Sequence, residues 1–431
     1  MLLEALHRWP PAWRAAVGLR AAEPEALHCR TVVPRLSLAA VLLAFAASGA
    51  VADEIDRQAM QRRPTASWTL AEREFGFAHW DRLYPARAIA RGRSVHELPQ
   101  GAPLAGFAPG GPGTRQLQRC VDDFGLAGLV VLHHGRLRLE HYAHGLGPDG
   151  RWVSFSVAKS LTGTLLGAAI RDGFIGSVDD AVTRYIPELQ GSVYEGVTLR
   201  QLLSMSSGVR WYEDLGDPAS DLMLMEQMPV APGMDATVSY MKTLKRDTAP
   251  GTRWRYNTGE SGLLGVVVSR VVRKPLADYA SQKIWAAYGM ESDASWTLDR
   301  SGHEHGGGRI QASTRDYARF GQFILDGALV DDRPVLPEGW LQAATRKQVD
   351  IGRPGFGYGY HWWTRDDGSF NAEGAYGQVI HIDPARGLVI AMNSASPEAA
   401  LTPASIAARI ALFNAVRAAV DEEPRTGVKS R

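Results

Sequence analysis

The apolar and polar positions along the chain predict strands near both ends and helices between them. An apolar run at 128–132 and an alternating stretch at 137–142 are separated by His134-Gly135, as is typical of a β-hairpin. Helical periodicity occurs at 156–171, 198–205, 221–228, 235–245, 260–273, 275–288, 314–326 and 403–420. Further strands are predicted at 358–364, 375–382 and 387–393.

This order predicts an α+β fold. We expect a mainly antiparallel sheet built from both chain ends and flanked by helices, with an inserted, mainly helical domain. The sheet domain would comprise 116–175 plus 306–425, and the helical insert 176–305. Residues 53–115 are rich in Pro, Gly and Arg with little periodicity, so they predict an irregular lead-in.

Residues 1–52 resemble a secretory signal peptide. The apolar run 36–49 follows Arg30 and Arg35 and ends at Ala50-Val51-Ala52. A basic start, a short apolar stretch and small residues predict cleavage after Ala52 and a periplasmic or secreted protein. An uncleaved anchor is the alternative, and the long stretch 1–30 suggests a start codon assigned too early.

Charge and cysteine content exclude several classes. The chain has 47 basic and 46 acidic residues, a net charge of +1, so no nucleic-acid partner is expected. Of the two cysteines, Cys29 lies in the predicted signal segment. Cys120 alone would remain in the mature chain, which excludes an internal disulfide and a cysteine metal site.

The strongest chemical signal is Ser156-Val157-Ala158-Lys159 at the start of a predicted helix. Positions i and i+3 share a helix face, so Lys159 can reach the Ser156 hydroxyl. A lysine accepts a proton only when its pKa is lowered, and the apolar helix that follows would bury it. Only seven of the 47 basic residues are lysines, so this one is informative. A helix N-cap serine is the competing interpretation.

A second Ser-x-x-Lys copy, Ser239 to Lys242, lies inside a predicted helix with a polar face, so we expect no chemistry there. Tyr256 precedes another apolar helix, where its phenol could relay protons. A core tyrosine is the alternative. The glycine-flanked strand 374–382 could supply backbone N–H donors to an oxyanion, or could contain a simple bulge.

These motifs, in this order, resemble the serine β-lactamase and penicillin-binding-protein superfamily. Within it the chain is most similar to class C-like serine hydrolases, especially the 6-aminohexanoate-dimer hydrolase and esterase branch. The resemblance covers about 75–420 and implies a β-lactamase-like fold. It also includes Met205-Ser206-Ser207-Gly208-Val209, Ala249-Pro250-Gly251-Thr252 and Tyr358-Gly359-Tyr360-His361-Trp362-Trp363.

The resemblance implies that Ser156 is the acylated nucleophile, Lys159 its base and Tyr256 the proton-transfer tyrosine. It implies an oxyanion hole made by the backbone N–H groups of Ser156 and Gln378. By the same analogy, the substrate would contact Tyr376, Gly377, Trp211 and Tyr212.

Two departures from the family pattern bear on the substrate. Asn257 directly follows the tyrosine, whereas related β-lactamases place an Asn two residues after it, so Asn257 receives no role. Ala375-Tyr376-Gly377 stands where penicillin-recognising members have Lys-Thr-Gly, so the lysine that would clamp a carboxylate is absent. This favours esters or amides with uncharged ends.

We therefore expect a serine hydrolase that cleaves a small-molecule ester or linear amide through an acyl-enzyme, without cofactor or metal. His303-Glu304-His305 lacks a metal-binding spacing, and no Gly-x-Ser-x-Gly motif supports an α/β-hydrolase. A β-lactamase, a D-amino-acid peptidase, an acyltransferase and a non-catalytic peptidoglycan-binding or sensing module remain alternatives. The sequence does not indicate the oligomeric state.

Overall fold

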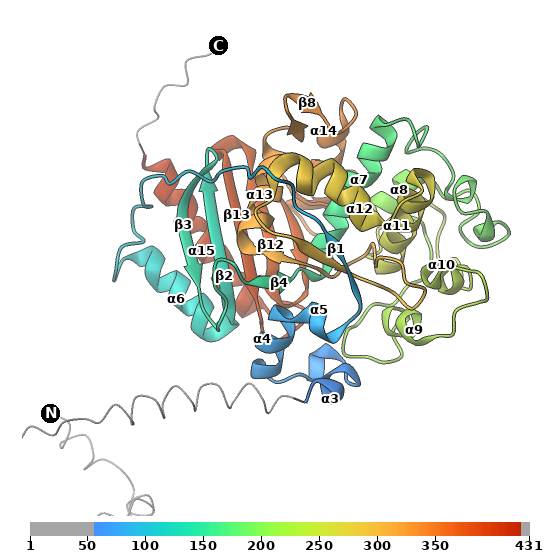
Figure 1. Ribbon diagram of the computed structural model, residues 1–431, viewed down its shortest axis with the longest axis horizontal. Coiled ribbons are helices and arrows are strands. Elements are labelled where there is room, and N and C mark those ends of the chain that lie inside the picture. The colour runs from blue at the N-terminus through green and yellow to red at the C-terminus, as the bar shows by residue number, and fades with distance from the viewer. Residues whose placement is uncertain (1–55, 424–431) are drawn as a thin grey trace, which may run out of the picture. The chain divides into compact units, whose positions relative to one another are not determined.

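The computed structural model describes residues 56–423 (Figure 1). The predicted signal segment 1–52 lies outside the described residues. The largest element is an antiparallel sheet of seven strands in the order β3-β2-β13-β12-β11-β10-β9. Its strands are β2 (Leu126–His133), β3 (Arg136–Tyr142), β9 (Phe356–Tyr358), β10 (Trp363–Arg365), β11 (Phe370–Gly374), β12 (Gln378–Asp383) and β13 (Leu388–Ser394). Both chain ends contribute, as predicted.

The predicted hairpin is confirmed. β2 pairs with β3, and the two residues of the turn, His134 and Gly135, have φ values of 49° and 70°. Positive φ at both central positions is the turn geometry whose twist matches that of the strands.

Alternate residues along the strands point to opposite faces of the sheet. Both faces are covered by helices, and each has its own core cluster (Figure 1). Val130 and Val389 join the larger core with α13 (Thr314–Leu325). Leu129 and Ile390 instead pack with α6 (Pro112–Phe124) and α15 (Pro403–Asp421). The period of two along β2 and β13 therefore separates one core cluster from the other.

The helical region between the chain ends contains the expected helices. They are α7 (Ala158–Arg171), α8 (Leu199–Leu203), α9 (Asp221–Gln227), α10 (Ala236–Met241), α11 (Thr258–Val272) and α12 (Leu276–Ala280), the last continuing as a π-helix, Ser281–Gly289. α14 (Trp340–Thr345) was not predicted. α7 and α11 are buried along almost their whole length and pack together, which fixes the position of Ser156 and Lys159 relative to Thr258.

A second sheet has the order β1-β5-β6-β4. Its strands are β1 (Ala86–Ile89), β4 (Arg151–Val153), β5 (Ala294–Thr297) and β6 (Ile310–Ser313), and a small hairpin joins β7 (Leu329–Val330) to β8 (Arg333–Pro334). The predicted domain boundary between 305 and 306 separates β5 from β6, although these strands pair.

The prediction of an irregular lead-in is wrong for its central part. It contains α3 (Arg57–Gln61), α4 (Leu70–Ala78), α5 (Trp80–Leu83) and β1. A capping box between Thr69 and Glu72 starts α4, and Phe77 and Trp80 are buried. The Pro, Gly and Arg content obscured a short but well-formed amphipathic segment.

Two strand predictions are displaced. The predicted strand 358–364 is instead the end of β9, a turn and the start of β10. The chain turns at His361, where φ is 61°. Residues 375–377 form a 3-10 turn with Tyr376 at φ 62°, so β12 begins at Gln378. The strand that precedes this turn, β11, was missed.

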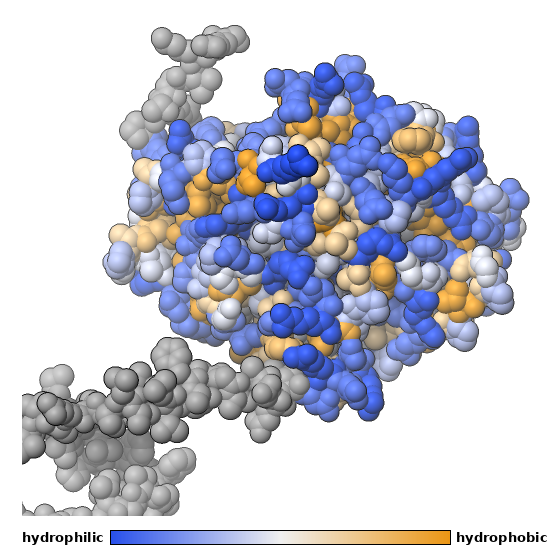
Figure 2. Space-filling view, in the orientation of Figure 1, coloured by the Kyte–Doolittle hydropathy of each residue, from blue (hydrophilic) through white to orange (hydrophobic). Residues whose placement is uncertain are grey.

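The surface shows small apolar patches separated by polar ones (Figure 2). Among the described residues, α15 is the one helix long and apolar enough to cross a membrane. Leu412 and Val416 of this helix are fully buried against the sheet, so its apolar face is explained by core packing.

Candidate active site

Ser156 lies in a strained turn directly before α7. The turn is a 3-10 helix, Phe155–Val157, and Phe155 has a φ of 44°, which is unusual for a non-glycine residue. The Phe155 ring packs against Phe77 and Tyr376, with ring centroids 5.0 and 5.1 Å away. This aromatic contact stabilises a backbone conformation that leaves the Ser156 side chain partly exposed.

Lys159 is fully buried and makes three hydrogen bonds. Its Nζ lies 2.9 Å from Ser156 Oγ, 2.8 Å from Thr258 Oγ1 and 2.6 Å from the carbonyl oxygen of Gly307. Burial lowers the pKa of Lys159 to about 8, although the Glu213 carboxylate opposes the change. A substantial fraction of Lys159 is therefore neutral near pH 8, beside a serine hydroxyl.

Glu213 connects to Lys159 through Thr258. Glu213 Oε1 accepts a hydrogen bond from Thr258 Oγ1 at 2.6 Å, and Oε2 accepts from the Thr258 backbone N–H at 2.9 Å. Trp211 Nε1 also donates to Oε2, at 2.8 Å. The loop after residue 210 is thus held to the start of α11, and its negative charge lies one hydroxyl away from Lys159.

Tyr256 lies over Lys159 and beside Ser156. Lys159 Nζ is 4.9 Å from the centroid of the Tyr256 ring, which stacks on Trp363 with centroids 5.6 Å apart. Burial raises the pKa of Tyr256, as does the nearby Glu213 charge, while a hydrogen bond with Ser156 acts in the opposite direction. The phenol therefore keeps its proton at neutral pH and can donate it.

The strand edge beside Ser156 is the end of β11. A Cβ added to Gly374 would lie 3.1 Å from the Ser156 backbone nitrogen and 2.3 Å from the Ser154 carbonyl oxygen. Gly374 and Ala375 border the cavity in front of Ser156. Only glycine allows β11 to approach this closely.

This arrangement corrects the placement of the strand-end residues. Tyr376 is completely buried, packs on Phe77 and hydrogen-bonds Thr65, and Gly377 is buried with it. Gln378 is 1% exposed, and its side-chain amide donates to the carbonyl oxygens of Ala375 and Ser394. These three residues do not line the cavity, because the turn at 375–377 directs them into the core.

Gly374→Ala is expected to lower kcat/KM for an ester by at least about 100-fold, because the added methyl group displaces β11 from Ser156. Gly147→Ala is the matched control, since nothing lies within 4 Å of the Cβ it adds. Kinetics and thermal unfolding of both variants test this expectation. An active, well-folded Gly374→Ala enzyme would contradict the proposed role of the strand edge.

Trp211 and Tyr212 also lie outside the cavity lining. Trp211 is buried and orients Glu213, whereas Tyr212 is exposed and bonds Asp217. Their neighbours Glu213, Asp214 and Leu215 line the cavity in their place. The prediction located the loop but not the side chains that face the cavity.

The cavity in front of Ser156 has a volume of about 510 Å³. Its apolar side chains include Leu215, Leu222, Ile351, Phe356, Trp363 and Ile406. Its charged side chains include Glu213, Arg309, Arg353, Arg365, Glu373 and Arg409. A pocket of this size and mixed polarity suits a small organic substrate with an apolar body and polar ends.

Thr258, Gly307 and Glu373 are site residues that sequence reasoning missed. Thr258 stands two residues after Tyr256, where the family pattern has Asn, and this spacing could have identified it. Gly307 lies in the glycine run 306–308, and its carbonyl oxygen accepts a hydrogen bond from Lys159. Asn257 caps α11 by accepting from the Glu260 backbone N–H at 3.2 Å. Its role is therefore in helix formation.

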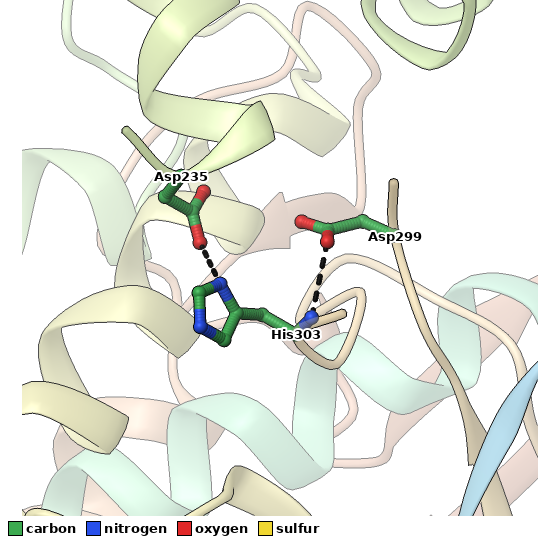
Figure 3. A group of neighbouring side chains, drawn as sticks. All are labelled: Asp235, Asp299 and His303. Carbon is green, nitrogen blue, oxygen red and sulfur yellow. Dashed lines mark hydrogen bonds and ion pairs between the residues drawn. The ribbon is translucent and has the colours of Figure 1, made fainter. Parts of the chain in front are cut away.

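One cluster of described residues could hold a metal ion: Asp235, Asp299 and His303 (Figure 3). Asp235 Oδ2 lies 2.7 Å from His303 Nδ1, and Asp299 Oδ1 accepts from the His303 backbone N–H at 3.1 Å. Asp235 Oδ1 caps α10. The atoms that would bind a metal ion therefore already take part in structural hydrogen bonds. None of the three residues lines the cavity at Ser156.

Comparison with known proteins agrees with this geometry. The model of the Beta-lactamase family matches residues 115–415, so the chain belongs to that family and is a hydrolase of the β-lactamase-related serine type. The chain is 29% identical over 368 residues to a 6-aminohexanoate-dimer hydrolase from Paenarthrobacter ureafaciens, which spans 81% of this chain and 90% of the relative.

Solved structures share the fold. A candidate 6-aminohexanoate-dimer hydrolase from Bacillus anthracis has a TM-score of 0.70 at 23% identity, covering 82% of this chain and 95% of its own. EstCE1, a hydrolase with promiscuous acyltransferase activity, has a TM-score of 0.55 at 15% identity, covering 72% and 97%. The β-lactamase-like α+β fold predicted from the sequence is confirmed.

Proposed function

We propose that this protein hydrolyses a small ester or linear amide through an acyl-enzyme formed on Ser156. The observation that carries the proposal is the buried Lys159, whose Nζ lies 2.9 Å from Ser156 Oγ and whose pKa burial lowers to about 8. A neutral lysine next to a hydroxyl is the arrangement that a serine nucleophile needs. The relative at 29% identity, named 6-aminohexanoate-dimer hydrolase, supports the ester or amide class.

In acylation, Ser156 Oγ attacks the substrate carbonyl carbon while its proton passes to Lys159. The backbone N–H groups of Ser156 and, in place of Gln378, Ala375 stabilise the oxyanion. Tyr256 donates its phenolic proton to the leaving oxygen or nitrogen and regains one from Lys159. Water then attacks the ester of Ser156, and the acid is released as the serine recovers its proton.

A substrate panel tests this proposal. We expect hydrolysis of 4-nitrophenyl butyrate and of a short linear amide, with much slower turnover of nitrocefin, each measured against Ser156→Ala as the blank. Rapid nitrocefin turnover would favour a β-lactamase. Ester formation from an added alcohol, in place of free acid, would favour an acyltransferase.

The dependence of the rate on pH has a definite sign. The base must be neutral, so kcat/KM for an ester is expected to be high at pH values above the Lys159 pKa of about 8 and to decrease as the pH falls below it. Glu213 raises the pKa of Lys159, so Glu213→Gln should shift the midpoint to lower pH. A pH–rate profile with an unmoved or raised midpoint would remove Lys159 from the role of base.

We also propose export. The basic start, the apolar run 36–49 and the small residues ending at Ala52 support a cleaved signal. Expression of the full chain in a bacterium should give a mature protein that begins at Asp53 and lies outside the inner membrane. Terminal sequencing of the purified protein and cell fractionation measure this, and an intact amino terminus would point to an anchor instead.

A further inference from the structure

Arg365 is a cavity residue with no assigned role. Arg365 of β10 pairs with Phe356 of β9. Two residues earlier on β10, Trp363 pairs with Asn371 of β11. Alternate strand residues share a face, so Arg365 and Phe356 face the same side as Trp363, Asn371 and Glu373. All five line the cavity. Their neighbours Thr364, Phe370 and Ala372 are buried on the opposite face.

Within residues 56–423, the Arg365 guanidinium has no ion pair within 4 Å and no side-chain hydrogen bond, and its Nε is buried without a partner. The Glu373 and Asp367 carboxylates act on it only from longer range. It lies 5.0 Å from the centroid of the Phe356 ring, and the Arg353 guanidinium lies 4.0 Å from the same centroid. Arg353 likewise has no acidic partner among the described residues. Arg353 is exposed, but Arg365 is partly buried, and leaving a partly buried guanidinium unpaired is costly, which indicates a missing anion.

The other cavity arginines are already neutralised. Arg309 pairs with Glu226, and Arg409 lies 3.3 Å from both oxygens of Glu373. Asn371 Nδ2 also donates to Glu373, at 2.7 Å. The ionised Glu373 lies on β11 next to Gly374, so it would repel an anion placed close to Ser156. Glu373 also acts on Arg365 from longer range, and the strand register places Arg365 further along β11 from Gly374, on the side away from Ser156.

We propose that Arg365 and Arg353, whose guanidinium groups both lie within 5.0 Å of the Phe356 ring centroid, bind a substrate carboxylate. The preferred substrate is then a linear ester or amide whose acyl chain ends in an acid. This rests on the proposed function, and it replaces the expectation of uncharged ends. A guanidinium fork matches a carboxylate in geometry and charge. From Gly374 to the position opposite Arg365, β11 and its preceding turn span about five residues, or about 17 Å. The carboxylate and the scissile bond must accordingly be separated by an extended apolar chain.

The test uses mono-4-nitrophenyl esters of butanedioic, octanedioic and dodecanedioic acid, each paired with its methyl-capped analogue. For wild type we expect the ratio of kcat/KM, acid over capped ester, to increase with chain length and to exceed about tenfold for the longest pair. Arg365→Met should lower that ratio by about tenfold or more, and added salt should lower it in wild type. Arg333→Met, on the exposed β8 turn, is the control that should leave the ratio unchanged.

A wild-type ratio at or below one for every chain length would overturn the carboxylate proposal, as would an unchanged ratio in Arg365→Met. Failure of the proposed function looks different, because no ester of either series would be hydrolysed faster than by Ser156→Ala. The ratio is internal to each variant, so a general loss of folded enzyme does not affect it.

Discussion

Replacing Ser156 with alanine is expected to abolish covalent labelling by a fluorophosphonate and to lower kcat for an ester by about 10⁴-fold or more. The hydroxyl lies 2.9 Å from the Lys159 amine in a strained turn that exposes it to the cavity. Intact mass measures the adduct directly: one on wild type, none on the variant. Wild type that is folded but unlabelled would remove Ser156 as the nucleophile.

The chain supplies its own control for this experiment. Ser239 has the same Ser-x-x-Lys spacing, but it lies within α10, accepts a hydrogen bond from the Ala231 N–H, and Lys242 is exposed. Ser239→Ala should therefore be labelled and active like wild type. The thiol of Cys120 is buried, and burial raises its pKa to about 11, so it does not compete for the probe. Lys159→Arg should be inactive despite its charge, because arginine does not deprotonate.

Sequence reasoning located the local elements of the site. The Ser-x-x-Lys spacing at the start of an apolar helix predicted both a shared face and a buried lysine, and the structure shows both. Periodicity likewise predicted the hairpin and most helices. These features depend on residues near each other in the chain, where helix and strand geometry alone determine which side chains meet.

The parts that failed depend on contacts between distant segments. β11 was missed because Asn371 and Glu373 interrupt its apolar pattern, although their polar side chains face the cavity and only Phe370 and Ala372 face the core. From the sequence, either Gly374 or Gly377 could be the glycine at which the strand approaches Ser156. The structure shows that it is Gly374, which lies against Ser154 and Ser156. No local pattern contains that information. A positive φ at Tyr376, stabilised by Thr65 and Phe77 from the lead-in, then directs the next residues away from the cavity.

The burial of individual polar residues also depends on contacts between distant segments, so the local sequence did not predict it. Glu260 is an ionisable residue in the first turn of α11, yet it is only 1% exposed. Its Oε1 accepts hydrogen bonds from Ser207, from Asn257 and, at 3.5 Å, from Tyr194, while Oε2 has no partner among the described residues. Burial raises the pKa of Glu260 to about 8, so the carboxyl behind the catalytic loop is largely protonated at neutral pH.

Glu260→Gln is therefore expected to stabilise the protein at alkaline pH. The folded pKa of about 8 lies above the ordinary glutamate pKa of 4.5, so the folded state binds the proton more tightly than the unfolded state. The stability from this proton is fully present below pH 4.5 and is lost as the pH rises towards 8, on the order of 5 kcal/mol in total. Gln is neutral throughout, so the variant should lack this loss.

Denaturant unfolding of wild type and Glu260→Gln between pH 5 and pH 9 measures the difference. We expect the two free energies of unfolding to be similar at pH 5 and to separate as the pH rises, with the variant more stable. Glu188→Gln is the matched control of opposite sign: its hydrogen bond with Arg270 lowers the pKa of Glu188, so that variant should lose a little stability at neutral pH and none at acid pH. Parallel pH profiles for wild type and Glu260→Gln would mean that Glu260 is already ionised in the folded state. Tyr194, Ser207 and Asn257 would then donate to a carboxylate rather than to an acid.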